Sequence, residues 1–463
     1  MEFRGRAFYP ANLSSPAPVV VLLHGRHAVC ESGSFALSWP CTTGAPIPSH
    51  LGYDYLAKAL AEKGMVVISI SANGINAKDN GTIDGGAMAR AELIQRHLEL
   101  LDDANRQATA PFGTTFVGRL DLSRVGTMGH SRGGEGVVQH YLYNQSLGTP
   151  FGVQAVLPLA PVDFNGLIPS AVPLAVTVGY CDGDVVTLEG VRFFDRARNA
   201  VPGDPAPKHL FISYGANHNF FNTVWSPSTY PIGAMDDWEI IESNFANIDP
   251  HCNTNAPSHR RLAEDEQQDL LEEIGVAFFS RYLLLHSTDD FLRGDDPLPM
   301  GSRGAPNRVT YHPADANGLT IHTFDGPDSI GTNDLGGTQS GQIGSYGLCG
   351  NLDEGQDACA TGGGFWGLSG QDPHQALGRF RAIYTSGHYL GETIPTADAD
   401  WTAYGTLQFR ASADVEPGGQ GTNLRVALRD QSGEVAFVDV SDVTDTLTAP
   451  PGNSPSITPR IMM

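Results

Sequence analysis

Short apolar runs alternate with helical patterns over the first 300 residues, and this alternation constrains the fold more than any other feature. The clearest run, Ala17-Pro-Val-Val-Val-Leu-Leu23, is rich in β-branched residues and leucine, as expected for a parallel strand that is buried on both faces. Similar runs follow at 65–70, 125–128, 153–159, 173–178 and 209–213. Helical patterns occur at 53–64, 87–105, 135–143 and 263–286. The predicted fold class is therefore α/β, with a doubly wound, mostly parallel sheet.

The pattern changes near residue 300, after a polar segment that contains prolines. Glycine-rich turns then separate short strand-like runs, at 320–324, 380–384, 405–411, 424–428 and 435–440. We therefore expect two domains, an α/β domain over residues 1–300 and an all-β sandwich, of jelly-roll type, over residues 301–463. The sequence stops where a further strand would begin, which suggests that the second domain is truncated at its C-terminus.

Charge and hydropathy exclude several classes of partner. The formal net charge is −23, which disfavours binding to nucleic acid or to anionic membranes. No apolar run reaches the length of a membrane span. Met1 is followed directly by Glu-Phe-Arg-Gly-Arg, without the apolar region of an export signal, so a secreted protein would have lost its signal peptide.

The cysteines favour an oxidising compartment. The chain has six of them, at Cys30, Cys41, Cys181, Cys252, Cys349 and Cys359. None forms a C-x-x-C motif, which removes the usual support for a zinc or thioredoxin-type site. The even number and the two close pairs, Cys30–Cys41 and Cys349–Cys359, favour disulfides, with the remaining two as a long-range bridge. Six buried thiols in a cytosolic protein are the alternative.

A candidate nucleophile lies in Gly129-His-Ser-Arg-Gly133, between a strand-type run and a helical pattern. Strand, tight turn and helix form the context of a nucleophile elbow, in which flanking glycines make room for a strained serine. With 54 glycines in the chain, the pattern alone could be an incidental turn. However, another strand-type run ends at His24-Gly25, and the carboxyl ends of parallel strands meet at one edge. We therefore predict that the backbone amides of Arg26 and Arg132 form an oxyanion hole.

Two later strand-type runs end on acids and on a histidine. Asp182 and Asp184 follow the run at 173–178, and His218 follows the run at 209–213. A serine hydroxyl needs an imidazole to take its proton and a carboxylate to fix the imidazole tautomer. The order Ser131, acid, His218 is that of the α/β-hydrolases. At this point both acids remain candidates.

Residues 1–300 resemble the α/β-hydrolases, near the branch that holds dienelactone hydrolases and cutinase-like polyester hydrolases. The resemblance rests on four motifs: His24-Gly25, Gly129-His-Ser-Arg-Gly-Gly134, Gly179-Tyr-Cys-Asp182 and Gly215-Ala-Asn-His218. It implies ester hydrolysis through an acyl-enzyme, with Ser131 as nucleophile, His218 as base and no required cofactor or catalytic metal. The family's G-x-x-D-x-x-V pattern selects Asp182 as the orienting acid and leaves Asp184 as the alternative.

The expected substrate is a carboxylic ester, either a small molecule or a polymer such as cutin or a synthetic polyester. Val162 and Arg132 stand where the polyester-hydrolase branch carries tryptophan and methionine, so a flat aromatic polymer is less favoured. A lactone or an amide could be cleaved by the same residues. A non-enzymatic binding module is a further alternative. The stretch 225–261 would either line the acyl pocket or form a surface insertion.

The second domain resembles accessory domains of secreted hydrolases in its general pattern only. Four aromatic residues are candidates for a sugar- or polymer-binding platform or for core packing, namely Trp366, Tyr389, Trp401 and Tyr404. Acidic clusters at 353–357 and 398–400 could hold a structural Ca²⁺, although neither fits EF-hand spacing and solvated turns are the alternative.

Overall fold

The strand-type runs of the first 300 residues form one sheet in the computed structural model. The structure describes residues 3–31, 35–185, 188–230, 250–287, 290–295, 298–324, 331–349, 379–411, 421–445 and 447–448. The chain divides into two compact units, one of residues 1–244 and 260–319 and the other of residues 245–259 and 320–463. The first unit thus extends past the boundary near residue 300 that the sequence predicts, since a strand at 307–312 belongs to its sheet.

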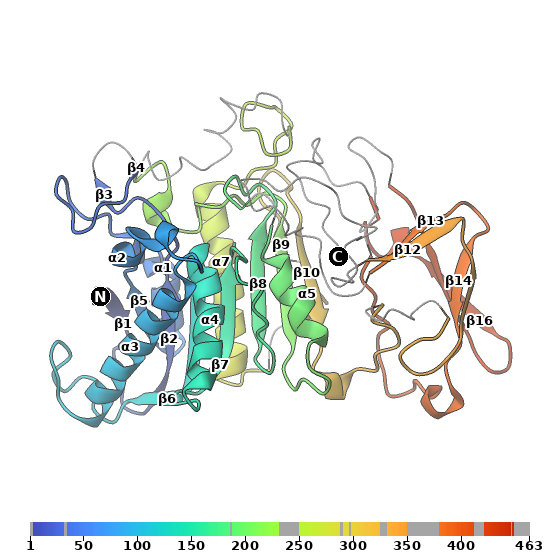
Figure 1. Ribbon diagram of the computed structural model, residues 1–463, viewed down its shortest axis with the longest axis horizontal. Helices are drawn as coiled ribbons and strands as arrows, with labels where there is room; N and C mark the ends of the chain where they lie inside the picture. Colours follow the sequence, from blue (N-terminus) through green and yellow to red (C-terminus); the bar gives the residue numbers. More distant parts are fainter. Residues whose placement is uncertain are drawn as a thin grey trace. The chain divides into compact units, whose positions relative to one another are not determined.

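Eight strands form the sheet of the first unit (Figure 1). In spatial order they are β1 (Gly5–Phe8), β5 (Val66–Ile70), β2 (Ala17–Leu23), β6 (Leu120–His130), β7 (Val153–Leu159), β8 (Leu174–Gly179), β9 (Lys208–Ser213) and β10 (Asn307–His312). The six inner strands are parallel, and the edge strands β1 and β10 are antiparallel to their neighbours. All seven residues of β2 are buried, as its unbroken apolar sequence predicts. The α/β class with a mostly parallel sheet is therefore confirmed.

Helices cover both faces of this sheet (Figure 1). One face carries α1 (Asp54–Glu62) and α7 (Glu264–Leu283), and the other carries α3 (Ala87–Arg106), α4 (Arg132–Ser146) and α5 (Val191–Asn199). Shorter elements of the unit are β3 (Cys30–Glu31), β4 (Phe35–Ala36), η1 (Ser49–Leu51), α2 (Asn73–Asn76), η2 (Asp79–Gly81), η3 (Thr223–Trp225), α8 (Asp290–Arg293) and η5 (Asp315–Asn317).

The chain changes direction across the sheet between β2 and β6. From β2 it passes through α1 to β5 on one side, whereas from β6 it passes through α4 to β7 on the other side. The strand order therefore reverses between the neighbouring strands β2 and β6. Such a topological switch point is where ligands bind in open α/β sheets. Leu23 pairs with Gly129 in the register, so His24-Gly25 and Ser131 leave the sheet side by side.

The described part of the second unit contains three antiparallel strand pairs. They are β11 (Gln339–Gln342) with β14 (Tyr389–Glu392), β12 (Ser345–Cys349) with β13 (Arg379–Ile383), and β15 (Arg425–Arg429) with β16 (Val435–Asp439), and the unit also holds η7 (Thr396–Asp398) and η8 (Val440–Asp442). The predicted strands at 320–324 and 405–411 do not form. At Thr323 the reason is local, because its backbone N–H donates to the Asp334 carboxylate at 2.7 Å instead of to a neighbouring strand.

Other predictions for the second unit are only partly covered by the described residues. Tyr389 and Tyr404 are 58% and 42% exposed, whereas the Trp401 indole donates to the carbonyl of Asp398 at 2.8 Å. The carboxylate of Asp400 accepts from Thr402, which is the behaviour of an acid that caps a turn. Trp366 and the cluster at 353–357 lie outside the described residues.

Disulfides are present, as the cysteine count predicts. Cys30 and Cys41 form one bridge across the loop that follows β2, and Cys181 and Cys252 are each disulfide-bonded. Cys359 lies outside the described residues, so the predicted Cys349–Cys359 bridge does too. In the described ranges, no helix combines the length and the apolar character that a bilayer crossing requires.

Candidate active site

Ser131 occupies the turn between β6 and α4 with a strained backbone. Its φ is 58° and its ψ is −124°, a combination that costs a non-glycine residue about 1–3 kcal/mol. The turn is held by the Ser131 N–H, which donates to the carbonyl of Leu159, and by the N–H of Gly134, which donates to the carbonyl of Ser131, both at 2.8 Å. This is the backbone geometry that a nucleophile elbow requires.

Two glycines let the neighbouring backbone approach this turn. A Cβ on Gly25 would lie 2.5 Å from the His130 carbonyl oxygen and 2.6 Å from the Ser131 Cβ. A Cβ on Gly129 would overlap the carbonyl group of Gly133. Glycine is thus required at both positions because a Cβ would meet backbone carbonyl groups, which cannot move aside as a flexible side chain can.

Substitution of Gly129 by alanine is expected to break this turn. Because the added methyl overlaps backbone atoms, we expect the free energy of unfolding to fall by at least about 2 kcal/mol in urea titrations. Gly81→Ala is the matched control, since a Cβ there has no neighbour within 4 Å and the residue has no positive φ. Equal stability of the two variants would contradict this explanation of the motif.

Asp182 and His218 are hydrogen-bonded to each other. The His218 Nδ1 lies 2.7 Å from Asp182 Oδ2, and both side chains are 1% exposed. Asp182 Oδ1 accepts from the backbone N–H groups of Asp184 and Val185 at 2.9 and 2.6 Å, which fixes the carboxylate plane. Asp184 lies on the other side of the imidazole, with its Oδ2 at 3.4 Å from Nε2 and its side chain 45% exposed.

The loop that carries His218 is hydrogen-bonded to α7 and lies next to the turn that carries Ser131. The side chain of Gln267 accepts from the backbone N–H of Asn217 at 3.0 Å and donates to the backbone carbonyl of Asn217 at 2.8 Å. It therefore binds both backbone polar groups of the residue before His218. The ring of His130, the residue before Ser131, lies with its centroid 4.9 Å from that of His218. The fold therefore gathers Ser131, Asp182 and His218 at the carboxyl ends of β6, β8 and β9.

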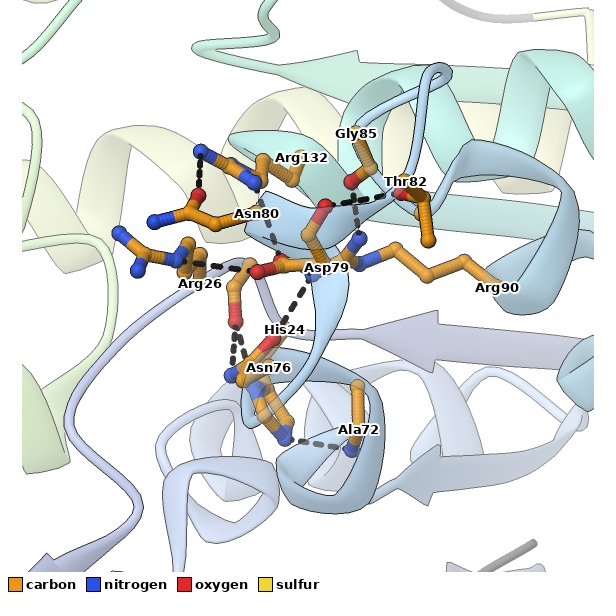
Figure 2. Close-up of polar contacts among 12 residues, drawn as sticks. His24, Arg26, Ala72, Asn76, Asp79, Asn80, Thr82, Gly85, Arg90 and Arg132 are labelled. Atoms are coloured by element: carbon orange, nitrogen blue, oxygen red, sulfur yellow. Dashed lines mark hydrogen bonds and ion pairs between the residues drawn. The ribbon is translucent and has the colours of Figure 1, made fainter. Parts of the chain in front are cut away.

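The side chains of Arg26 and Arg132 meet at one buried carboxylate, that of Asp79 (Figure 2). Asp79 Oδ1 accepts from Arg26 Nε at 3.1 Å, and Oδ2 lies 2.7 Å from Arg90 and 3.2 Å from Arg132. Asp79 and Arg90 are fully buried, whereas the other two side chains are slightly exposed. Burial lowers the pKa of Arg90, and the charge of Asp79 opposes that shift.

His24 fixes the backbone that follows β2. Its Nε2 lies 2.8 Å from the backbone N–H of Ala72 and therefore accepts, so the proton is on Nδ1, which donates to the Gly25 carbonyl at 2.9 Å. Burial lowers the pKa of His24 to about 3, which keeps the ring neutral. A neutral ring has one donor and one acceptor, and both are used here.

No protein-family model matches the chain, and no curated protein matches it in sequence. The functional argument therefore rests on the geometry of the site. In the described residues there is no group of three or more histidine, cysteine, aspartate or glutamate side chains that could hold a metal ion.

Aromatic residues surround the serine turn. Trp225 is fully buried, stacks on His27 with centroids 4.9 Å apart, and lies 4.8 Å from the ring of His130. The start of the stretch 225–261 thus belongs to the surroundings of the site, whereas residues 231–249 lie outside the described ranges. Val162 is buried, and Phe164 lies under the Arg132 guanidinium at 5.4 Å.

Sequence reasoning did not identify Asn76, Asp79, Arg90 or Gln267. Asn76, Asp79 and Gln267 contact residues far away in the chain, namely Gly25, Arg132 and Asn217. Arg90 joins this network through Asn76 and Asp79. Their local sequences carry no motif, so only the tertiary contacts reveal them.

Proposed function

We propose that this protein is a serine hydrolase of the α/β-hydrolase type that cleaves carboxylic esters. The observation that carries the proposal is the strained Ser131 at a topological switch point, close to a histidine that is hydrogen-bonded to a buried carboxylate. The order of Ser131, Asp182 and His218 along the chain supports the same reading.

In the proposed mechanism, Ser131 Oγ attacks the ester carbonyl carbon while His218 Nε2 takes its proton. Asp182 holds the proton on Nδ1, so that Nε2 carries no proton and can act as the base. The amides of Arg26 and Arg132 would stabilise the oxyanion. His218 then protonates the leaving alcohol, and a water molecule, deprotonated by His218, releases the acid from the acyl-enzyme. Asp182 is favoured over Asp184 because it contacts Nδ1, the nitrogen that faces away from the proton transfer.

Small esters and polyesters both remain candidate substrates, as does a lactone or an amide. The disulfides support a secreted protein, since such bonds persist in oxidising compartments. The strand pairs of the second unit support an accessory β-sandwich.

Covalent labelling tests the proposal. We expect an alkyl fluorophosphonate to inactivate the native protein and to add one adduct, which peptide mass spectrometry assigns to Ser131. Hydrolysis of p-nitrophenyl acetate, butyrate and octanoate, run in parallel, gives the preferred acyl length. Heat-denatured protein is the control and should not react, because serine nucleophilicity depends on the folded site. A native protein that neither reacts nor hydrolyses any of these esters would refute the proposal.

A further inference from the structure

Asn76, at the end of α2, is held in one orientation by two hydrogen-bond partners, one a donor and the other an acceptor. Its Oδ1 accepts from the guanidinium of Arg90 at 2.7 Å, and its Nδ2 donates to the Gly25 carbonyl at 2.9 Å. A guanidinium can only donate and a carbonyl can only accept, so the amide cannot be turned around. Asn76 is 1% exposed, and Arg90 is in turn held by Asp79 (Figure 2).

The Gly25 carbonyl therefore accepts two hydrogen bonds, one from His24 Nδ1 and one from Asn76 Nδ2. It belongs to the same peptide unit as the N–H of Arg26. In a trans peptide the carbonyl and the N–H point in opposite directions, so two donors on the carbonyl also fix the direction of the Arg26 N–H. They polarise the peptide as well, which makes that N–H a better donor.

This peptide lies against the predicted nucleophile. A Cβ built on Gly25 would be 3.2 Å from Ser131 Oγ. On its other side, the Arg26 side chain is tied to Asp79, the same carboxylate that contacts Arg132. The contacts of Asn76 thus belong to one buried network that connects both residues of the predicted oxyanion hole.

We propose that Asn76 is a positioning residue for the oxyanion hole, and this inference rests on the proposed function. Asn76 does not touch the substrate. It acts through the Gly25–Arg26 peptide, which it turns so that the Arg26 N–H faces the oxygen of the reacting carbonyl. Its contribution therefore appears in the transition state, where that oxygen carries negative charge, more than in the bound ester.

The test compares Asn76→Asp with Asn73→Asp. Aspartate at 76 keeps the shape and the acceptor for Arg90 but turns the donor to Gly25 into a second acceptor. We expect kcat to fall about 100-fold with KM changed less than about threefold, as for loss of an oxyanion donor. The inhibition constant of an alkyl trifluoromethyl ketone, whose adduct with serine carries an oxyanion, should rise by a similar factor.

Asn73→Asp is a matched control on the same short helix. Asn73 is also buried, and its Nδ2 donates to a backbone carbonyl at 2.9 Å, but that carbonyl is Ile47. We expect its kcat and its ketone affinity to stay within about threefold of wild type, even where its thermal midpoint falls as far as that of Asn76→Asp.

Three results would overturn the inference. One is an Asn76→Asp protein whose kcat matches that of Asn73→Asp. Another is a loss of kcat without a loss of ketone affinity. If Asn76→Asp does not fold by circular dichroism, Asn76→Ala removes the donor without adding an acceptor, and wild-type kcat in that variant is the third. A wild-type protein that is inert toward esters and fluorophosphonate would instead refute the proposed function, and this inference with it.

Discussion

Replacement of Ser131 by alanine is expected to lower kcat for p-nitrophenyl esters by a factor on the order of 10⁵ to 10⁶. The reason is that the acyl-enzyme cannot form without Oγ, which leaves only binding and the oxyanion hole to accelerate attack by water. The folded structure should be retained, because the hydroxyl is not what holds the turn. Its backbone hydrogen bonds to Leu159 and Gly134 remain available in the variant.

Ser146→Ala is the control for this substitution. Ser146 lies at the far end of α4, is exposed, and its hydroxyl donates locally to the Tyr143 carbonyl. We expect its kcat to stay within about twofold of wild type. Steady-state kinetics with active-site titration measures both variants. If Ser131→Ala hydrolysed esters at the wild-type rate, the nucleophile assignment would be wrong.

Replacement of Asp182 by asparagine should lower kcat about 10⁴-fold. The Asp182 carboxylate accepts from two backbone N–H groups on one oxygen, so an asparagine would place its carbonyl oxygen there and its NH₂ toward His218. The imidazole would then have to accept at Nδ1 and carry its proton on Nε2. In that tautomer it cannot take the serine proton.

Asp184→Asn is the comparison that separates the two candidate acids. Asp184 is half-exposed and lies near Nε2 rather than Nδ1, so we expect its kcat to fall less than about tenfold. The pair is measured by kcat and KM on the preferred ester. A larger loss in Asp184→Asn than in Asp182→Asn would transfer the orienting role to Asp184.

Much of the first unit could be predicted from periodicity, because its strands are buried on both faces and its helices are amphipathic. The run Ala17–Leu23 is the clearest case, since every residue of it is buried in the centre of the sheet. The β6 strand was predicted too short, at 125–128 instead of Leu120–His130. Its first half is polar and more exposed, so it does not show the unbroken apolar pattern of a buried strand.

The second unit was harder to predict. Its strands are short and largely exposed, as β15 and β16 show, so hydrophobic alternation carries little information about them. The run at 320–324 has strand-like residues, but the nearby Asp334 carboxylate satisfies a backbone N–H that a strand would use for pairing. A hydrogen bond of this kind depends on whether a later loop brings a polar side chain close to the run, and the composition of the run does not specify this.

Strand ends and a glycine-flanked serine are local patterns, so the α/β class and the candidate residues Ser131, Asp182, Asp184 and His218 could be predicted from the sequence. The three-dimensional structure was needed to show which nitrogen of His218 each acid contacts, since that depends on the path of the loop after β8. It also revealed the contacts of Asn76 with Gly25 and of Asp79 with Arg26. Buried polar groups must find partners wherever the fold brings them, and those partners are rarely neighbours in the chain.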